Sequence, residues 1–232
     1  MAQRFANAAE RAHTAAEEVW HAATHGIGIV MAVVALVFLV LKATMLGGAK
    51  EITAVSIYGG SAVLLYLAST VYHAAFKSSF QPFLEVVDHA AIYLKIAGSY
   101  TPFALITLPT ITGVTILVTV WALAAVGIVL KFVLHFIDGG IRKYDWISLL
   151  GYVGMGWIAI FVAWPLFQNL PIAGFVWLVA GGICFTIGAF FFAWKSRRYT
   201  HAVFHVWVLL GSVCHFVAIY SYVLGNPLKL AA

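Results

Sequence analysis

Two histidines open an apolar stretch near the end of the chain, THAVFHVWVLLGSVCH (residues 200–215). His201 and His205 are four residues apart, so on a helix both rings lie on one face, about 40° apart around the axis. Such rings are costly among apolar side chains unless they have a partner. His73 lies near the end of another apolar stretch, SAVLLYLASTVYHAAF. Because three imidazoles suit Zn²⁺ and leave its fourth position for water, we predict a zinc site of His73, His201 and His205.

Asp88 and Ser69 are the predicted chemical partners of this zinc site. Asp88 begins the stretch DHAAIYLKIAGSYTPF, and Ser69 lies four residues before His73, on the same helical face. Zinc lowers the pKa of a bound water to about 7. Asp88 would serve as a base beside that water or as a fourth ligand, and Ser69 would hydrogen-bond Asp88 or the water. The alternative is that the histidines are packed side chains bonded to backbone carbonyls, or polar residues at the membrane interface.

The composition indicates that a lipid bilayer surrounds these residues. Of 232 residues, 63% are hydrophobic and 9% are charged, whereas soluble domains carry about 25% charge. The mean hydropathy is +0.99. The net charge of +5 is not gathered into a basic, aromatic-rich patch, so we expect no nucleic-acid partner. Cys184 and Cys214 lie inside apolar runs, and we expect small core residues there rather than a disulfide.

Seven apolar stretches are long enough to cross roughly 30 Å of hydrocarbon. The breaks between them carry turn residues such as Gly47-Gly48, Pro109 and Pro171. An odd number of spans puts the two termini on opposite sides of the membrane. We predict an all-α integral membrane fold, one seven-helix transmembrane bundle over residues 1–232, with spans at about 25–46, 52–76, 87–108, 112–136, 147–167, 171–194 and 201–224.

The residues before the first span carry a helix-start signal. Residues 1–20 lack the short apolar core and cleavage site of a signal peptide. Thr14 followed by Glu17 fits a capping box, in which each side chain bonds the other's backbone N–H. We expect a cytoplasmic interfacial helix within residues 1–24 that leads into the first span.

The distribution of Lys and Arg predicts the orientation, because basic residues gather on the cytoplasmic side. If the N-terminus is inside, the outer segments hold only Lys42, Lys50 and Lys229. We therefore expect a cytoplasmic N-terminus, an external C-terminus and a zinc site at the cytoplasmic side of the plasma membrane. The inner segments would hold Arg4, Arg11, Lys77, Lys131, Arg142, Lys143, Lys195, Arg197 and Arg198.

Lys95 and His215 are polar residues deeper in the predicted spans. Lys95 lies seven residues after Asp88, on the same helical face and about 10 Å deeper in the membrane. A charge at that depth costs on the order of 3 kcal/mol unless it faces the protein interior or a water-filled cavity. It would meet a lipid oxygen there, or snorkel or pair with backbone carbonyls. His215 lies about 21 Å beyond His201, too far to share its metal. It would line a cavity or hydrogen-bond a neighbouring helix.

Three further histidines have simpler expected roles. His21 and His25 form a second pair spaced by four, with Glu17 one turn earlier. They would form a separate metal site, or be interfacial polar residues at the start of the first span. His135 closes the fourth predicted span, and we expect it at the interface.

Several motifs together resemble one family. They are EEVWHAATHGIG (17–28), Ser69 with His73, DHAAIYLKIAGSYTPF (88–103) and THAVFHVWVLLGSVCHF (200–216). In this order they resemble the bacterial hemolysin III family, part of the progestin and adipoQ receptor superfamily, which groups with alkaline ceramidases as proposed membrane hydrolases. The resemblance implies seven helices, a cytoplasmic N-terminus and zinc held by His73, His201 and His205, with Asp88 and Ser69 beside it. One departure is His21, where the family motif EE-x-x-N-x-x-TH has asparagine.

These observations favour a zinc-dependent hydrolase that acts on a lipid amide or ester, with membrane lipids as its partners. The alternative is a non-enzymatic receptor or regulator of membrane homeostasis in which zinc is structural. A cytolytic, pore-forming protein is a third hypothesis. We disfavour it because the sequence shows no amphipathic segment that would pass from water into a membrane. An ion or proton pathway through His215 and Lys95 is a fourth. The sequence does not define the oligomeric state.

Overall fold

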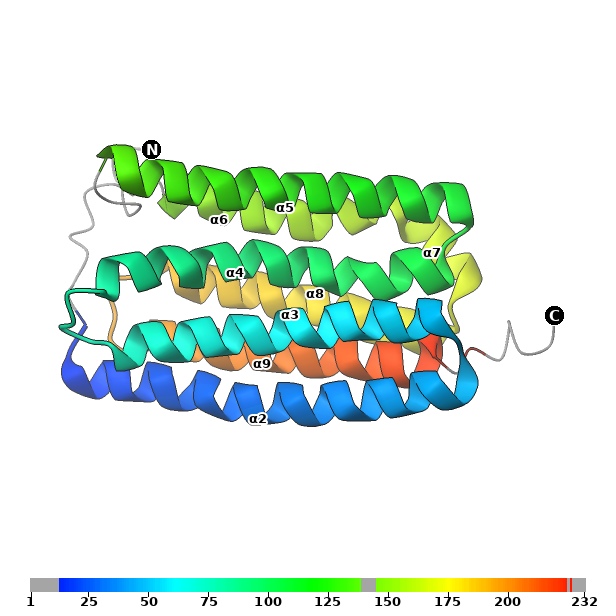
Figure 1. Cartoon of the computed structure of the whole chain (residues 1–232), viewed down its shortest axis with the longest axis horizontal. Coiled ribbons are helices and arrows are strands. Elements are labelled where there is room, and N and C mark those ends of the chain that lie inside the picture. Colours follow the sequence, from blue (N-terminus) through cyan, green and yellow to red (C-terminus); the bar gives the residue numbers. More distant parts are fainter. Residues whose placement is uncertain (1–12, 139–144, 225, 227–232) are drawn as a thin grey trace.

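The computed structural model describes residues 13–138, 145–224 and 226, and these residues form helices and connecting turns without a strand. Figure 1 shows the helices packed side by side in one elongated bundle. Short π-helical segments at Phe103–Thr107 and Ile219–Val223 extend two helices, and a 3₁₀ segment at Ile158–Val162 joins two others. The helices are α2 (Ala15–Leu46), α3 (Ala49–Ala74), α4 (Gln81–Pro102), α5 (Thr110–Asp138), α6 (Asp145–Trp157), α7 (Ala163–Asn169), α8 (Ile172–Ala193) and α9 (Thr200–Ala218).

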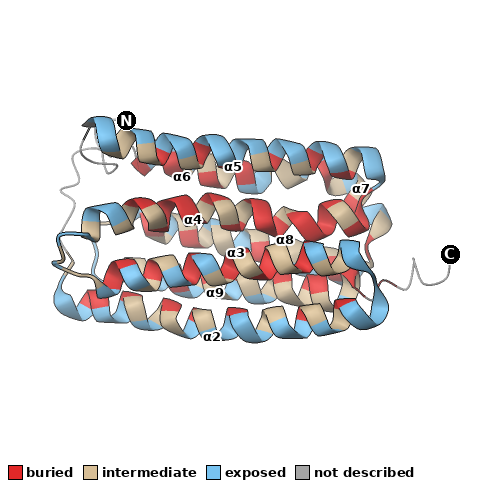
Figure 2. Cartoon of the chain, in the orientation of Figure 1, coloured by how far each residue is buried: buried red, intermediate tan, exposed pale blue. Residues whose placement is uncertain are grey.

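The chain runs back and forth along the bundle, so that α2 begins at one end and the segment after α9 finishes at the other (Figure 1). Six of these passes are long and apolar enough to cross a membrane. The exception is α4, which carries Asp88, His89 and Lys95 and is buried along much of its length, between α3 and α5 (Figure 2). The described part of the chain is therefore an all-helical membrane protein whose most polar helix is shielded by its neighbours.

Helix α2 begins where the capping box predicts. The Glu17 N–H donates to Thr14 Oγ1 (3.3 Å), and the Thr14 N–H donates to Glu17 Oε2 (2.9 Å). The helix then continues without a break to Leu46. Residues 15–24, predicted as a separate interfacial helix, are the first turns of this long helix, because nothing in that stretch interrupts backbone hydrogen bonding. Residues 1–12 of the predicted segment lie outside the described residues.

The predicted fifth span is an interrupted helix rather than a continuous one. Pro165 has no N–H to donate and its ring crowds the carbonyl of residue 161, so the helix tightens into the 3₁₀ segment just before it. Tyr100 of α4 replaces part of the missing hydrogen bonding. Its hydroxyl accepts from the Ala159 N–H (2.9 Å) and donates to the Gly156 carbonyl (2.6 Å). Irregular backbone is thus satisfied by a side chain inside the bundle, as a membrane requires.

The end of α4 packs closely against α3 and changes its helical type. A Cβ on Gly98 would lie 2.1 Å from Ser61 Oγ of α3, so only glycine allows the two helices to approach this closely. Pro102 frees a carbonyl one turn earlier, and the helix widens into the π-helical segment before it stops at Pro109. Cys184 and Cys214 are free thiols, as expected.

Candidate metal centre

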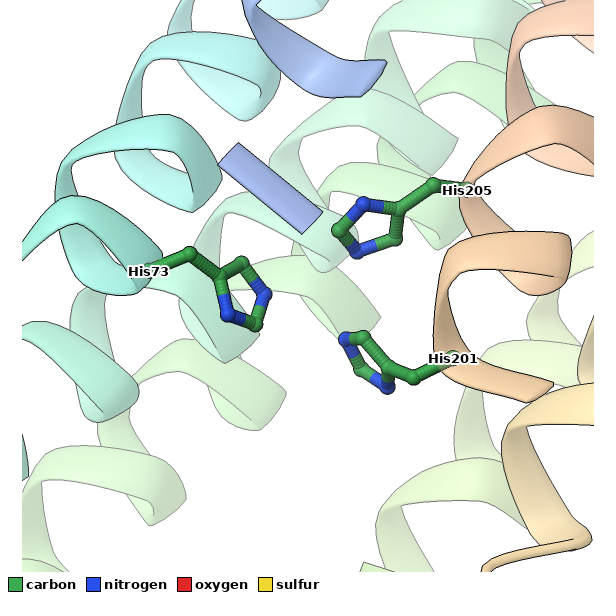
Figure 3. Close-up of side chains that lie close together, drawn as sticks. All are labelled: His73, His201 and His205. Carbon is green, nitrogen blue, oxygen red and sulfur yellow. The ribbon is translucent and has the colours of Figure 1, made fainter. Parts of the chain in front are cut away.

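Three histidines from two helices converge at one end of the bundle. His73 lies in the last turn of α3, and His201 and His205 lie in the first turns of α9. Figure 3 shows the three rings facing one another across the space between these helices. One nitrogen from each ring lies within 4.8 Å of the other two. We call these residues the histidine triad; the structure brings together the three side chains that the sequence predicted as ligands.

The donor set of the triad fits a transition metal such as zinc. Zinc binds imidazole nitrogen at about 2.0–2.1 Å, so tetrahedral ligand nitrogens lie roughly 3.4 Å apart. The triad nitrogens therefore need to close by at most about 1.4 Å, which side-chain rotation supplies. His73 is 2% exposed and His205 is 1% exposed. Nε2 of His73 and Nε2 of His201 are buried and have no hydrogen-bond partner among the described residues, so both are free to bind an ion.

Contacts on the far side of two rings orient their lone pairs inward. Nδ1 of His73 lies 2.6 Å from Glu18 Oε2, and its Nε2 has no hydrogen-bond partner among the described residues. Nδ1 of His205 lies 3.2 Å from the backbone oxygen of His21. An ionised carboxylate only accepts, so in His73 the Nδ1 carries the hydrogen and Nε2 the lone pair. Nδ1 of His205 also lies 3.1 Å from the Thr24 hydroxyl. Carboxylate and carbonyl partners of this kind position metal-binding histidines.

The start of α9 is tied to the start of α2. Tyr199, just before α9, has a left-handed backbone (φ 62°) that is unfavourable for a bulky residue. Its N–H donates to Glu17 Oε1 (3.2 Å). This bond joins the capped end of α2 to the first turn of α9 and so fixes the depth of His201 relative to α2.

Helix α2 places two further histidines, His21 and His25, against the triad, and the sequence did not predict this contact. His21 and His25 were expected as a separate metal site or as interfacial residues; they are 0% and 3% exposed, so neither is an interfacial residue, and their rings lie against those of the triad. The His21 ring lies 4.8 Å from the rings of both His73 and His201. The His25 ring stacks on His205 at 3.5 Å. The sequence does contain a signal for this contact: Glu18, His21 and His25 are spaced by three and four, so they share one helical face.

Asp88 and Ser69, the predicted chemical partners of the zinc site, line the same cavity as two rings of the triad. Both are buried, at 7% and 1% exposure, and the Ser69 hydroxyl lies near the Asp88 carboxyl. Both line a cavity that His201 and His205 also line. A carboxyl group therefore lines the same cavity as two of the triad rings.

That cavity has a volume of about 280 Å³ and extends from the triad toward the middle of the bundle, between α4, α6, α8 and α9. Its walls are mostly apolar. It continues past His89 to Lys95, Ser99 and His215 at greater depth. Apolar wall residues include Ile92, Ile96, Leu178, Phe185 and Val208.

Lys95 and His215 both face this cavity and both have protein partners. Lys95 is 4% exposed; its Nζ donates to Ser99 Oγ (3.1 Å) and lies 4.2 Å from the centroid of the Tyr58 ring. The Nε2–H of His215 donates to the Leu178 carbonyl (3.3 Å). His215 is thus both an interhelical hydrogen-bonding residue and a cavity residue, and it does not join the triad. His135 is half-buried at the end of α5, against aromatic rings.

The fold and the site define a multi-pass helical membrane protein with a buried histidine cluster that could hold a metal ion. The family model described as "Haemolysin-III related" matches residues 13–216, and the chain belongs to that family. The protein is therefore a multi-pass protein of the plasma membrane, as predicted.

Three relatives illustrate the breadth of the family. Hemolysin-3 of Bacillus cereus is 41% identical over 208 residues, which cover 90% of this chain and 92% of the relative. The Hemolysin-3 homolog of Bacillus subtilis (strain 168) is 40% identical over 214 residues, 92% of this chain and 98% of the relative. The Monocyte to macrophage differentiation factor of Homo sapiens is 28% identical over 179 residues, 74% of this chain and 71% of the relative. This distant likeness supports the wider superfamily.

Zinc should stabilise the folded protein through the triad. A ligand present at one hundred times its Kd adds about 2.7 kcal/mol to the free energy of unfolding when it binds only the folded state. We expect zinc to raise the midpoint of thermal unfolding in detergent, a chelator to reverse this, and His73→Ala to reduce the zinc-dependent rise. The matched control, His135→Ala, should keep the full rise. An equal rise in the His73→Ala variant would show that the triad does not bind the ion.

Proposed function

We propose that this protein is a zinc-dependent hydrolase that acts on an amide or ester bond of a membrane lipid. One observation carries the proposal: His201 and His205 of the triad line a mostly apolar cavity that the carboxyl group of Asp88 also lines. An apolar cavity that opens beside a polar, metal-binding end suits a substrate with a hydrocarbon chain and one reactive polar bond.

Each residue has a distinct task in this proposal. His73, His201 and His205 hold the ion, which when bound polarises a carbonyl and lowers the pKa of water. Glu18 orients the His73 ring. Asp88 accepts a proton from the attacking water and returns it to the leaving group. The Ser69 hydroxyl, which lies near the Asp88 carboxyl, would orient it.

The deep end of the cavity would contact the rest of the lipid. Lys95 and Ser99 are the polar groups there, with His215 nearby. A buried ammonium group favours an oxygen-bearing partner over a hydrocarbon chain. We propose that Lys95 meets an oxygen of the lipid, while the apolar walls accept its chain.

The competing function is a receptor or regulator in which zinc is structural. This alternative is favoured because side chains from three helices meet at the site: Glu18 of α2, His73 of α3 and His205 of α9. An ion there would join three helices. Removal of zinc would then lower stability without loss of any lipid turnover.

The name of the Bacillus relatives refers to the lysis of blood cells. In this chain, the polar side chains of the described helices converge on an enclosed cluster and cavity, and the outer faces are apolar. These features suit a permanent membrane resident, so we propose hydrolysis rather than pore formation as its activity.

We further propose that all seven passes cross the membrane as a single domain, with the N-terminus in the cytoplasm and the C-terminus outside. The alternating passes support this, and α4 needs less apolar surface because its neighbours cover it. Lys77 and the basic turn Lys195–Arg198 lie at the triad end of the bundle, at the ends of α3 and α8. The triad would then lie on the cytoplasmic side.

Cysteine labelling tests this orientation. In a chain whose Cys184 and Cys214 are replaced by alanine, Lys50→Cys and Ser79→Cys place an exposed thiol at opposite ends of the bundle. We expect a membrane-impermeant thiol reagent to label Lys50→Cys in intact cells, and Ser79→Cys only after the cells are opened. Labelling with the reverse pattern would contradict the orientation.

Lipid hydrolysis by the purified protein tests the activity. Ceramides and glycerolipids in nanodiscs should be cleaved with a dependence on zinc. Asp88→Asn should lower kcat by about 10²–10⁴-fold, the usual contribution of a positioned base, and should leave the zinc content unchanged. Asp145→Asn is the matched control, since Asp145 does not line the cavity and pairs with Lys195 (2.7 Å). The absence of turnover on every lipid class would refute the proposal.

A further inference from the structure

We propose that a second metal ion binds next to the triad, held by His13, Glu18 and His21. One donor atom from each of these residues lies within 4.8 Å of the other two. The set is distinct from the triad, although it lies against it. It comes entirely from α2 and the residue before its cap.

His21 is the strongest indication of an ion at this place. Its side chain is fully buried, at 0% exposure, and neither ring nitrogen has a hydrogen-bond partner among the described residues. The nearest carboxylate oxygen, Glu18 Oε2, lies 3.5 Å from its Nδ1. A buried imidazole without hydrogen bonds is unfavourable, and a cation bound to one nitrogen would remove that cost.

Glu18 lies between the two sets of donors. Its Oε2 is 2.6 Å from Nδ1 of His73 and 3.5 Å from Nδ1 of His21. Its negative charge would offset the repulsion between two neighbouring cations. The adjacent carboxylate, Glu17, has other tasks, because it caps α2 through Thr14 and accepts from the Tyr199 N–H. Only one of the two consecutive glutamates therefore faces the histidines.

The rings are close enough for two ions to be neighbours. The His21 ring centroid lies 4.8 Å from that of His13 on one side and 4.8 Å from those of His73 and His201 on the other. Two imidazoles and a carboxylate form a donor set that zinc accepts, with a further position for water. The inference concerns metal content alone and does not depend on lipid hydrolysis.

Zinc stoichiometry of the full-length protein tests this second site. The protein in detergent is stripped with a chelator, reloaded with excess zinc, desalted and analysed for zinc per chain. We expect two ions in the wild type and one in both His21→Asn and His13→Asn. His135→Asn, the same change at the end of α5, should keep two. Thermal unfolding in chelator shows that each variant is folded.

The outcomes separate the two sites. One ion in both the wild type and His21→Asn, or two in both, would overturn the second site. One ion in the wild type and none in His21→Asn would also overturn it, because His21 would then be a ligand of a single ion. His73→Asn tests the triad independently: it should lose one ion, and full retention would refute the triad while leaving the His21 result to be judged separately.

Discussion

The cost of burying polar groups away from water governs this structure. Six imidazole rings and the carboxylate of Glu18 gather at one end of a bundle whose outer surface is apolar. In such surroundings each polar atom needs a protein partner or an ion. The backbone carbonyl of His21 and the Glu18 carboxylate satisfy some of them. The inward-facing nitrogens that remain without partners define where a cation is needed.

The same constraint explains the arrangement of the helices around the cavity. Helix α4 carries the carboxyl group and the ammonium group that lipid would reject, so it lies among the other helices, where Ser69, Ser99 and Tyr58 contact these groups. Gly98 allows α4 to approach α3 closely. A polar helix in the interior leaves an enclosed space with polar groups at two depths and apolar walls between them. The proposed lipid substrate follows from that distribution.

Much of this could be predicted from the sequence. Hydropathy predicted the passes, and the pair Thr14 and Glu17 predicted the start of α2. The common depth of His73, His201 and His205 predicted that these side chains converge. The interruption before Pro165 was missed because span length was judged by hydropathy, which does not register a lost hydrogen bond. The part of α2 in the cluster was missed because sequence does not fix how a helix is rotated about its axis. Polar residues spaced by three and four lie on one helical face whether that face is exposed at the membrane interface or buried against other helices.

The central claim is that the triad binds one metal ion through its three imidazoles. X-ray absorption at the zinc edge, measured on the zinc-loaded His21→Asn variant, isolates this ion from any second one. The account predicts nitrogen or oxygen neighbours at about 2.0–2.1 Å, with outer-shell scattering from three imidazoles. A shell of oxygen alone without imidazole scattering, or sulfur at about 2.3 Å, would contradict it.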